Sequence, residues 1–307
     1  MELKNLNITI AGGTGFLGQV LIEYFKTRVK HIYVLSRKFR PNNKQVTYLI
    51  WDGENQGDWT QALASSDVLI NLAGKSVDCR YTAANKKAII DSRVDSTKAL
   101  GIAMHNCETP PTIWINASTG TIYEHSESTP MDEEHGRLGN TFSEEVAKKW
   151  ERAFFDFYRR EVRQVAVRIA IVLGKKGGAL QPIKAISKLG FGGQQGNGNQ
   201  QISWMHEEDF ARAIAFIITH PEQEGIFNLA APLPIRNRHF MQNLRAVLKV
   251  PLGINLPKPL LELGALLIKT ETELILKSRY VQPKRLLNAG FKHKYTSPEL
   301  ALKDLLS

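Results

Sequence analysis

The feature that most constrains the fold is a glycine-rich turn between a β-rich segment and a helical one. Asn7 to Ile10 is short and β-rich, and Val20 to Tyr24 continues with helical spacing. Between them Gly12, Gly15 and Gly18 recur at every third position. Such a turn surrounds a diphosphate with backbone N–H groups and a helix N-terminus, so it predicts a dinucleotide site; the alternative is an ordinary strand-to-helix connection. The expected contacts are Gly12, Thr14, Gly15, Phe16, Leu17 and Gly18.

Apolar segments alternate with segments of helical spacing along most of the chain. Strands are expected at 31–35, 46–51, 67–71, 112–116 and 165–168, and helices at 81–105 and 142–160. This alternation predicts an α/β fold, a Rossmann-like doubly wound parallel sheet covered on both faces. Beyond residue 229 prolines and Leu-rich helical sequence follow. We therefore expect an NAD(P)-binding domain with substrate-loop insertions at 1–234 and a small, mainly helical C-terminal domain at 235–307.

The residues after the second expected strand indicate which dinucleotide is bound. NAD-selective folds usually carry an Asp or Glu there, which binds the ribose hydroxyls. This chain has Ser36 and Arg37 instead. A guanidinium pairs with a 2′-phosphate and a serine hydroxyl can hydrogen-bond it, so NADP (NADPH) is favoured over NAD. The alternative is that Arg37 is only a surface charge. Asp52, after the third strand, is a candidate partner for the adenine amino group.

Composition restricts the class of protein further. A chain of 307 residues that is 43% hydrophobic can bury a normal core. Cys79 and Cys107 form no CxxC pair, so free thiols, no metal site and a cytoplasmic location are expected. The segment 236–307 holds 13 Lys/Arg against 5 Asp/Glu, but they are dispersed among leucines. We interpret them as a solvated basic face that attracts an anionic ligand, and expect neither nucleic acid nor a membrane as partner. The oligomeric state stays open.

Several motifs together resemble a known family. The glycine turn, then Asn71-Leu72-Ala73-Gly74, then Ala117-Ser118-Thr119 leading to Tyr123, are similar to the extended short-chain dehydrogenase/reductases. More narrowly, the chain resembles the atypical branch called "epimerase family protein", in which an NAD(P)-binding domain precedes a C-terminal domain of unknown function. The matching segments are 91–95, 150–151, 168–174, 177–180, 203–209, 228–232 and 283–287. The resemblance implies cofactor contacts from Leu72, Ala73 and Gly74.

The resemblance also raises a question about catalysis. In the wider superfamily a Ser or Thr holds the substrate oxygen, a Tyr transfers the proton, and a Lys four residues later binds the nicotinamide ribose. Ser118 and Thr119 supply the first element. Phe142 and Val146 stand where the Tyr and Lys are expected, and neither can transfer a proton.

Other residues are candidates for the missing chemistry. Tyr123 is either the replacement acid or a packed tyrosine with a satisfied hydroxyl. His206 is a candidate base beside a helix start. Arg93 binds either an anionic ligand group or a neighbouring Asp, and Glu151 is expected to be an internal ion-pair partner. The glycine-rich segment 190–201 is expected to be a substrate lid, or else a plain flexible connection.

Two functions are compatible with these features. The first is an NADP-dependent oxidoreductase or epimerase acting on a small polar or anionic carbonyl or hydroxyl compound, such as a nucleotide-linked sugar. The second is a non-catalytic NADP(H)-binding sensor or regulatory protein, which the missing Tyr-Lys pair allows. A third, an interaction protein that merely retains the fold, does not account for the complete glycine turn.

Overall fold

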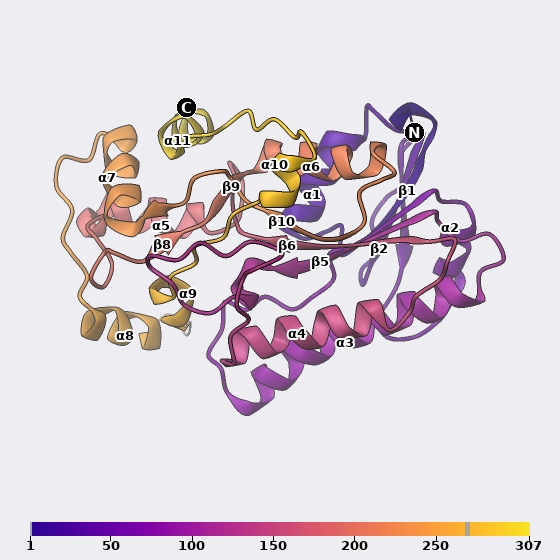
Figure 1. The fold of residues 1–307 in the computed structure, drawn as a ribbon, viewed down its shortest axis with the longest axis horizontal. Helices are drawn as coiled ribbons and strands as arrows, with labels where there is room; N and C mark the ends of the chain where they lie inside the picture. Colours follow the sequence, from indigo (N-terminus) through magenta and orange to yellow (C-terminus); the bar gives the residue numbers. More distant parts are fainter. Residues whose placement is uncertain (1, 268–270) are drawn as a thin grey trace.

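A seven-stranded parallel sheet forms the centre of the computed structural model, which describes residues 2–267 and 271–307 (Figure 1). The strand order is β10-β6-β5-β4-β1-β2-β3, which is that of a Rossmann-like fold, as expected. The strands are β1 (Asn7–Ala11), β2 (His31–Ser36), β3 (Val46–Ile50), β4 (Val68–Asn71), β5 (Ile113–Thr119), β6 (Arg163–Ile169) and β10 (Gly225–Leu229). Because all neighbours are parallel, their carboxyl ends meet at one edge, and the order reverses between β1 and β4.

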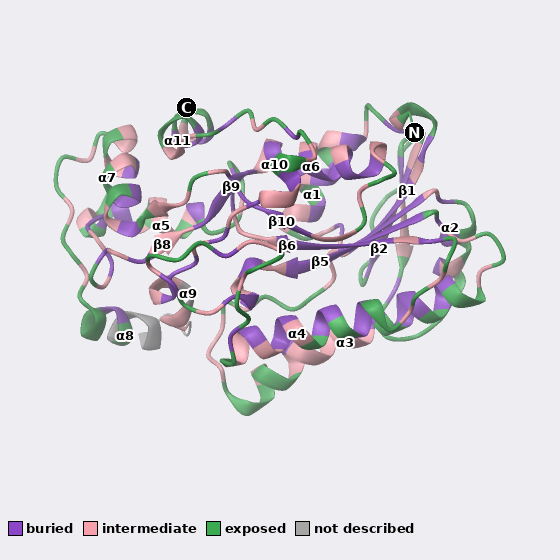
Figure 2. Cartoon of the chain, viewed as in Figure 1, coloured by how far each residue is buried: buried purple, intermediate pink, exposed green. Residues whose placement is uncertain are grey.

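Helices cover both faces of this sheet, so the central strands are almost continuously apolar and buried (Figure 2). On one face lie α1 (Phe16–Phe25) and α6 (Glu207–Thr219), which contribute Phe25 and Phe210 to the core. On the other face lie α2 (Gln61–Ala64), α3 (Ala83–Asn106) and α4 (Phe142–Phe155). The helix expected at 142–160 ends early, where the Gln164 side chain of β6 donates a hydrogen bond to the Phe154 carbonyl (3.0 Å).

A third hydrophobic cluster, after those on the two faces, lies beside the sheet and joins residues from both sides of position 235. It contains Leu180 and Trp204 together with Phe240, Leu244 and Leu302. Its elements are β7 (Ile171–Leu173), α5 (Leu180–Ile186), β9 (Trp204–His206), α7 (Asn237–Leu248) and α11 (Pro298–Leu306). The remaining strands and α-helices are β8 (Gln201–Ile202), β11 (Ile235–Arg236), α8 (Lys258–Leu267), α9 (Glu273–Leu276) and α10 (Lys284–Asn288). Among the described residues, 2–267 and 271–307, no helix is both long enough and apolar enough to cross a membrane.

Candidate dinucleotide and substrate site

The glycine turn lies at the carboxyl end of β1, and each of its glycines meets a different constraint. Gly12 has φ +74°, and a Cβ there would come within 2.7–2.8 Å of the Leu72 and Ala73 backbone. A Cβ on Gly18 would lie 2.4 Å from the Cα of Gly13, so this glycine lets α1 pack on the turn. Gly15 is exposed, and its Cβ would meet only the Gly12 carbonyl at 3.4 Å. The backbone at Gly15 is therefore open to a ligand.

The first turn of α1 has free hydrogen-bond donors. Gly15 is its N-cap residue and provides no side-chain cap. The N–H groups of the first turn have no partner within the helix, and they carry the positive end of the helix dipole. An anion such as a diphosphate accepts hydrogen bonds from these N–H groups and is attracted by the positive end of the dipole. These residues therefore fit the dinucleotide that the sequence predicts.

Phe16 holds the turn against a later glycine-rich segment. A Cβ on Gly174, Gly177 or Gly178 would approach the Phe16 ring to within 2.3–2.8 Å. Only glycines therefore leave room for this ring, which gives a physical reason for the Gly177-Gly178 pair noted in the sequence. Phe16 has a packing role in this arrangement.

The carboxyl end of β2 carries a group of exposed cations. Ser36 ends the strand, and Arg37, Lys38 and Arg40 follow, all exposed and unpaired with any carboxylate that the structure describes. The Ser36 hydroxyl donates to the Lys38 carbonyl (2.9 Å) and accepts from the Lys38 N–H, so it already has partners. Arg37, Lys38 and Arg40 are thus the exposed cations here, and contact of Ser36 or Arg37 with a 2′-phosphate stays a prediction.

Asp52 is engaged in its own loop. Its carboxylate accepts hydrogen bonds from the Glu54 and Asn55 N–H groups and from the Asn55 side chain. These bonds, that of the Asn55 side chain first, lower the pKa of Asp52 to about 2. Contact with an adenine amino group stays a prediction.

The segment after β4 lies against the glycine turn, and Arg93 supports it from α3. The Arg93 guanidinium donates to the carbonyls of Lys75 (2.9 Å) and Ile89 (3.0 Å) and lies over the Trp150 ring. Burial lowers the pKa of Arg93 to about 10. Asp91, one of the neighbouring acids considered as its partner, pairs instead with Lys87 (2.5 Å). Arg93 thus shapes the segment Leu72-Ala73-Gly74, where the sequence predicts cofactor contacts.

Ser118 belongs to a buried polar network that begins at the carboxyl end of β5. Its hydroxyl donates to Glu151 Oε1 (2.6 Å). Glu151 receives two hydrogen bonds from Arg168, each 2.8 Å, which confirms the expected internal ion pair. Burial alone would lower the pKa of Arg168, but the hydrogen bonds and charge of Glu151 outweigh it and raise that pKa. All three residues are buried.

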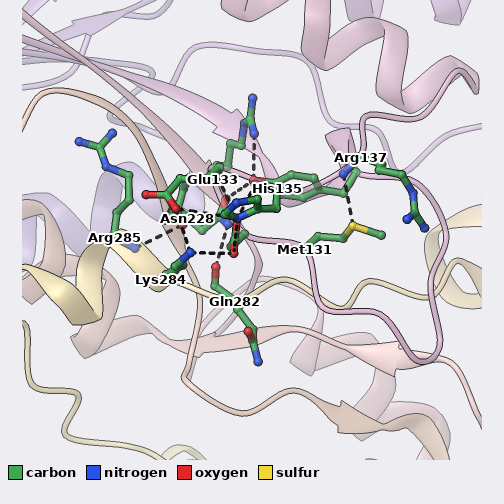
Figure 3. Close-up of polar contacts among 12 residues, drawn as sticks. Met131, Glu133, His135, Arg137, Asn228, Gln282, Lys284 and Arg285 are labelled. Atoms are coloured by element: carbon green, nitrogen blue, oxygen red, sulfur yellow. Dashed lines mark hydrogen bonds and ion pairs between the residues drawn. The ribbon is translucent and has the colours of Figure 1, made fainter.

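The same network extends to Tyr123 and through it to Asn228, which Figure 3 shows beside Glu133 and Gln282. The Tyr123 hydroxyl accepts from Arg168 Nη1 (2.8 Å) and donates to Asn228 Oδ1 (3.0 Å). Asn228 in turn donates its N–H to Glu133 (2.8 Å) and its side-chain amide to the Gln282 carbonyl (2.8 Å). Tyr123 is only 2% exposed. This geometry favours the packed tyrosine with a satisfied hydroxyl, one of the two interpretations that the sequence left open.

Thr119 ends β5 next to the start of α4. Its Oγ1 accepts from the Thr121 N–H (3.1 Å), which leaves the hydroxyl proton available to a ligand. At the first residue of α4, Phe142 packs edge-on against Tyr81, with ring centroids 4.8 Å apart. Val146, one turn later, is buried. The usual Tyr-Lys positions are therefore filled by apolar side chains.

His206 contacts α6 and the C-terminal segment. None of these contacts involves Ser118, Thr119 or the glycine turn. Its Nδ1 accepts from the Glu208 N–H (3.0 Å) and caps α6. Its Nε2 lies 3.3 Å from the Asp304 carboxylate, and its ring stacks on Tyr295. A role as catalytic base stays a prediction, and the observed role is that of a helix cap.

Burial of His206 predicts a pH-dependent stability. Burial lowers its pKa, opposed by the charges of Asp304, Asp209 and Glu208. The unfolded chain therefore takes up a proton more readily, so the free energy of unfolding should fall as pH falls below about 6.5. His206→Asn keeps an acceptor for the cap and removes the titration. Urea unfolding at pH 7.5 and 5.5 should show that the variant loses less free energy of unfolding between these pH values than the wild type. An equal loss would contradict the assignment to His206. Some pH dependence should remain in the variant, because burial also lowers the pKa of His293.

The segment expected to be a lid is attached to the C-terminal part of the chain. Gly193 donates its N–H to the Ile254 carbonyl (3.1 Å), and Gln194 accepts from the Leu256 N–H (2.9 Å). Gln195 exchanges hydrogen bonds with the Asn237 side chain. A lid function stays a prediction; the observed contacts hold the segment in place.

Three polar side chains near α4 were not identified from the sequence. The buried Lys277 donates to Glu144 and to the Thr121 carbonyl (2.9 Å), and burial lowers its pKa against the charge of Glu144. Arg279 donates to Thr121 Oγ1 (3.0 Å). Tyr81 comes from the loop after β4. Lys277 and Arg279 belong to no motif or periodic segment, and Tyr81 only begins the helix expected at 81–105, so no sequence signal marked any of the three as a site residue.

The fold, the turn and the exposed cations define the chain as a dinucleotide-binding α/β protein. It belongs to the NAD dependent epimerase/dehydratase family, whose model matches residues 8–230, and a domain of unknown function matches residues 256–305. An epimerase family protein of Staphylococcus epidermidis is 35% identical over 298 residues, which cover 97% of this chain and 98% of the relative. One from Staphylococcus aureus is 32% identical over 300 residues, 97% of this chain and 98% of the relative.

Solved structures agree with this assignment. The human epimerase family protein SDR39U1, determined with NADPH, is 27% identical with a TM-score of 0.87, covering 98% of this chain and 99% of that one. A nucleoside-diphosphate sugar epimerase from Corynebacterium glutamicum is 26% identical with a TM-score of 0.76, covering 98% of this chain and 58% of that one. The resemblance to the atypical short-chain dehydrogenase/reductases that the sequence indicated is thus confirmed.

Proposed function

We propose that the protein binds NADP(H) and acts as an oxidoreductase or epimerase on a small polar or anionic carbonyl or hydroxyl compound, such as a nucleotide-linked sugar. The observation that carries this proposal is the open backbone at Gly15 beside the uncapped N-terminus of α1. The NADPH in the human relative and the sugar epimerase among the solved structures support it.

The preference for NADP rests on Arg37. A hydrogen-bonded charge pair contributes about 1.5–3 kcal/mol, or roughly 10- to 100-fold in affinity. Fluorescence titration should therefore give tighter binding of NADPH than of NADH. In Arg37→Asp, the introduced carboxylate repels a 2′-phosphate, and the preference should disappear or reverse.

A matched control makes the same charge change elsewhere. Arg160 lies just before β6, at the amino edge of the sheet and so opposite the glycine turn, and Arg160→Asp is the control variant. It should leave the ratio of the two affinities unchanged. If Arg37→Asp leaves that ratio unchanged too, Arg37 is not the group that selects the cofactor.

Turnover separates an enzyme from a sensor. NADPH consumption should be measured with a panel of carbonyl compounds that includes nucleotide-linked 4-keto sugars. Thr119→Ala should lower the rate with little effect on NADPH affinity, because we assign this hydroxyl, whose proton is not used by the Thr121 N–H, to the substrate and not to the diphosphate. Tight NADPH binding without turnover of any compound would instead favour the non-catalytic sensor, which the apolar Phe142 and Val146 permit.

A further inference from the structure

Tyr81 is fixed at the entrance to α3, in the loop that leaves the carboxyl end of β4. It directly precedes Thr82, whose side chain caps α3 by accepting from the Asn85 N–H (3.2 Å). The Tyr81 N–H donates to Glu271 Oε1 (2.6 Å), which also lies 3.5 Å from Arg80 Nε. The backbone of Tyr81 is thus held from the C-terminal part of the chain.

The ring of Tyr81 occupies space beside the position where the wider superfamily carries its tyrosine. It packs against Phe142 with centroids 4.8 Å apart and an interplanar angle of 66°. Phe142 has no proton to donate, but the tyrosine in contact with it does. The loop reaches this place from Leu72-Ala73, which lies against Gly12 on the side of β4. In folds of this kind the second half of a dinucleotide lies on that side of the switch point.

The hydroxyl of Tyr81 is buried, and no hydrogen bond of normal geometry joins it to a described residue, although the Ser143 side chain lies near enough to lower its pKa. A buried hydroxyl without a partner costs about 1–3 kcal/mol, so its position has a physical reason if a ligand supplies that partner. Burial raises the pKa of Tyr81 most, and the charges of Glu273 and Cys79 raise it further, while hydrogen bonding to Ser143 and the charge of Arg279 oppose the rise. The phenol therefore remains protonated at neutral pH and is a donor.

We propose that Tyr81, held against Phe142, donates the proton to the reacting oxygen of the substrate in place of the missing tyrosine. This inference rests on the proposed function, because it requires a bound nicotinamide. It assigns the proton donor to a loop residue from β4 rather than to Tyr123, whose hydroxyl proton is already given to Asn228.

The step balances for reduction of a carbonyl compound. A reduced nicotinamide supplies a hydride to the carbonyl carbon. The electron pair of the C=O π bond moves to the oxygen, which takes the phenolic proton of Tyr81. The carbonyl is reduced to an alcohol, the nicotinamide is oxidised, and the phenolate regains its proton from water. In this proposal the hydroxyl of Thr119, whose proton is not used by the Thr121 N–H, donates a hydrogen bond to the same oxygen.

The first test does not depend on turnover. The protein contains eight tyrosines, and incorporation of 3-fluorotyrosine gives each a ¹⁹F resonance. Tyr81→Phe keeps the ring on Phe142 and identifies the Tyr81 signal by its loss. Saturating NADPH should shift this signal and leave that of Tyr158 unmoved, since Tyr158 is 72% exposed beside the amino end of β6. A Tyr81 signal that does not move, while fluorescence shows bound NADPH, overturns the proposal.

The second test uses 4-nitrobenzaldehyde as the carbonyl probe. Tyr81→Phe should lower kcat by about 10²–10⁴-fold and abolish the alkaline limb of the kcat profile. NADPH affinity and Tm should remain those of the wild type, and Tyr158→Phe should change nothing. An unchanged kcat overturns the proposal while the proposed function stands. If NADPH does not bind at all, the proposed function itself fails. If NADPH binds but the aldehyde is not reduced, the ¹⁹F experiment remains the test, and an unmoved Tyr81 signal overturns the proposal.

Discussion

Replacing Arg168 with methionine should lower the free energy of unfolding by about 3–5 kcal/mol, the usual cost of breaking a buried ion pair from one side. Arg168 is 4% exposed and satisfies both oxygens of Glu151 as well as the Tyr123 hydroxyl. Its loss leaves a carboxylate without a counter-charge inside the protein. Urea unfolding followed by tryptophan fluorescence measures the effect.

A second variant separates the charge from the packing. Arg168→Met combined with Glu151→Gln removes both charges, and glutamine still offers an oxygen to the Ser118 hydroxyl. The double variant should therefore be more stable than Arg168→Met alone. If Arg168→Met alone lowers the free energy of unfolding by less than about 1 kcal/mol, the Arg168–Glu151 ion pair behaves like a solvent-exposed one. The interpretation of this network as a buried ion pair would then be wrong.

Gly15→Ala should weaken NADPH binding by at least about tenfold and leave the fold intact, because the second glycine of such a turn allows the diphosphate to approach the backbone. A Cβ at Gly15 meets only one carbonyl oxygen at 3.4 Å, and φ is −77°, which alanine adopts readily. The loss should appear in a fluorescence titration, with Tm close to that of the wild type.

Gly18→Ala is the matched variant that should also destabilise the fold. A Cβ at Gly18 would lie 2.4–2.6 Å from Gly13 backbone atoms, so α1 must move away from the turn. Its Tm should fall as well as its NADPH affinity. Wild-type affinity in Gly15→Ala would show that the diphosphate does not approach this part of the turn, and the dinucleotide argument would lose its main support.

The network around Arg168 also explains why sequence motifs alone were ambiguous about catalysis. Ser118 is one of two hydroxyls that the sequence offers for the substrate oxygen, and Tyr123 is its candidate replacement acid. In this protein the hydroxyls of both Ser118 and Tyr123 donate to buried partners. Thr119 keeps a free hydroxyl proton because only its oxygen is used, by the Thr121 N–H. The structure thus separates the roles of Ser118 and Thr119, the two neighbouring hydroxyls that the sequence offers for the substrate oxygen.

The sequence by itself determined the parallel sheet, the glycine turn and the cations after β2. These features depend on local patterns: runs of apolar residues, glycines at fixed spacing, and the charge next to a strand end. It also determined that Phe142 and Val146 replace the Tyr-Lys pair, because that comparison needs only the order of residues along the chain.

Only the tertiary structure decided which side chains meet at the carboxyl edge of the sheet. Tyr81 is positioned by Glu271, 190 residues further along the chain, and Lys277 reaches the Thr121 carbonyl across 156 residues. It also showed that His206 caps α6 and lies beside Asp304 in α11. Contacts between such distant segments depend on how loops pack after the sheet has formed, and no periodicity or motif in the chain encodes them.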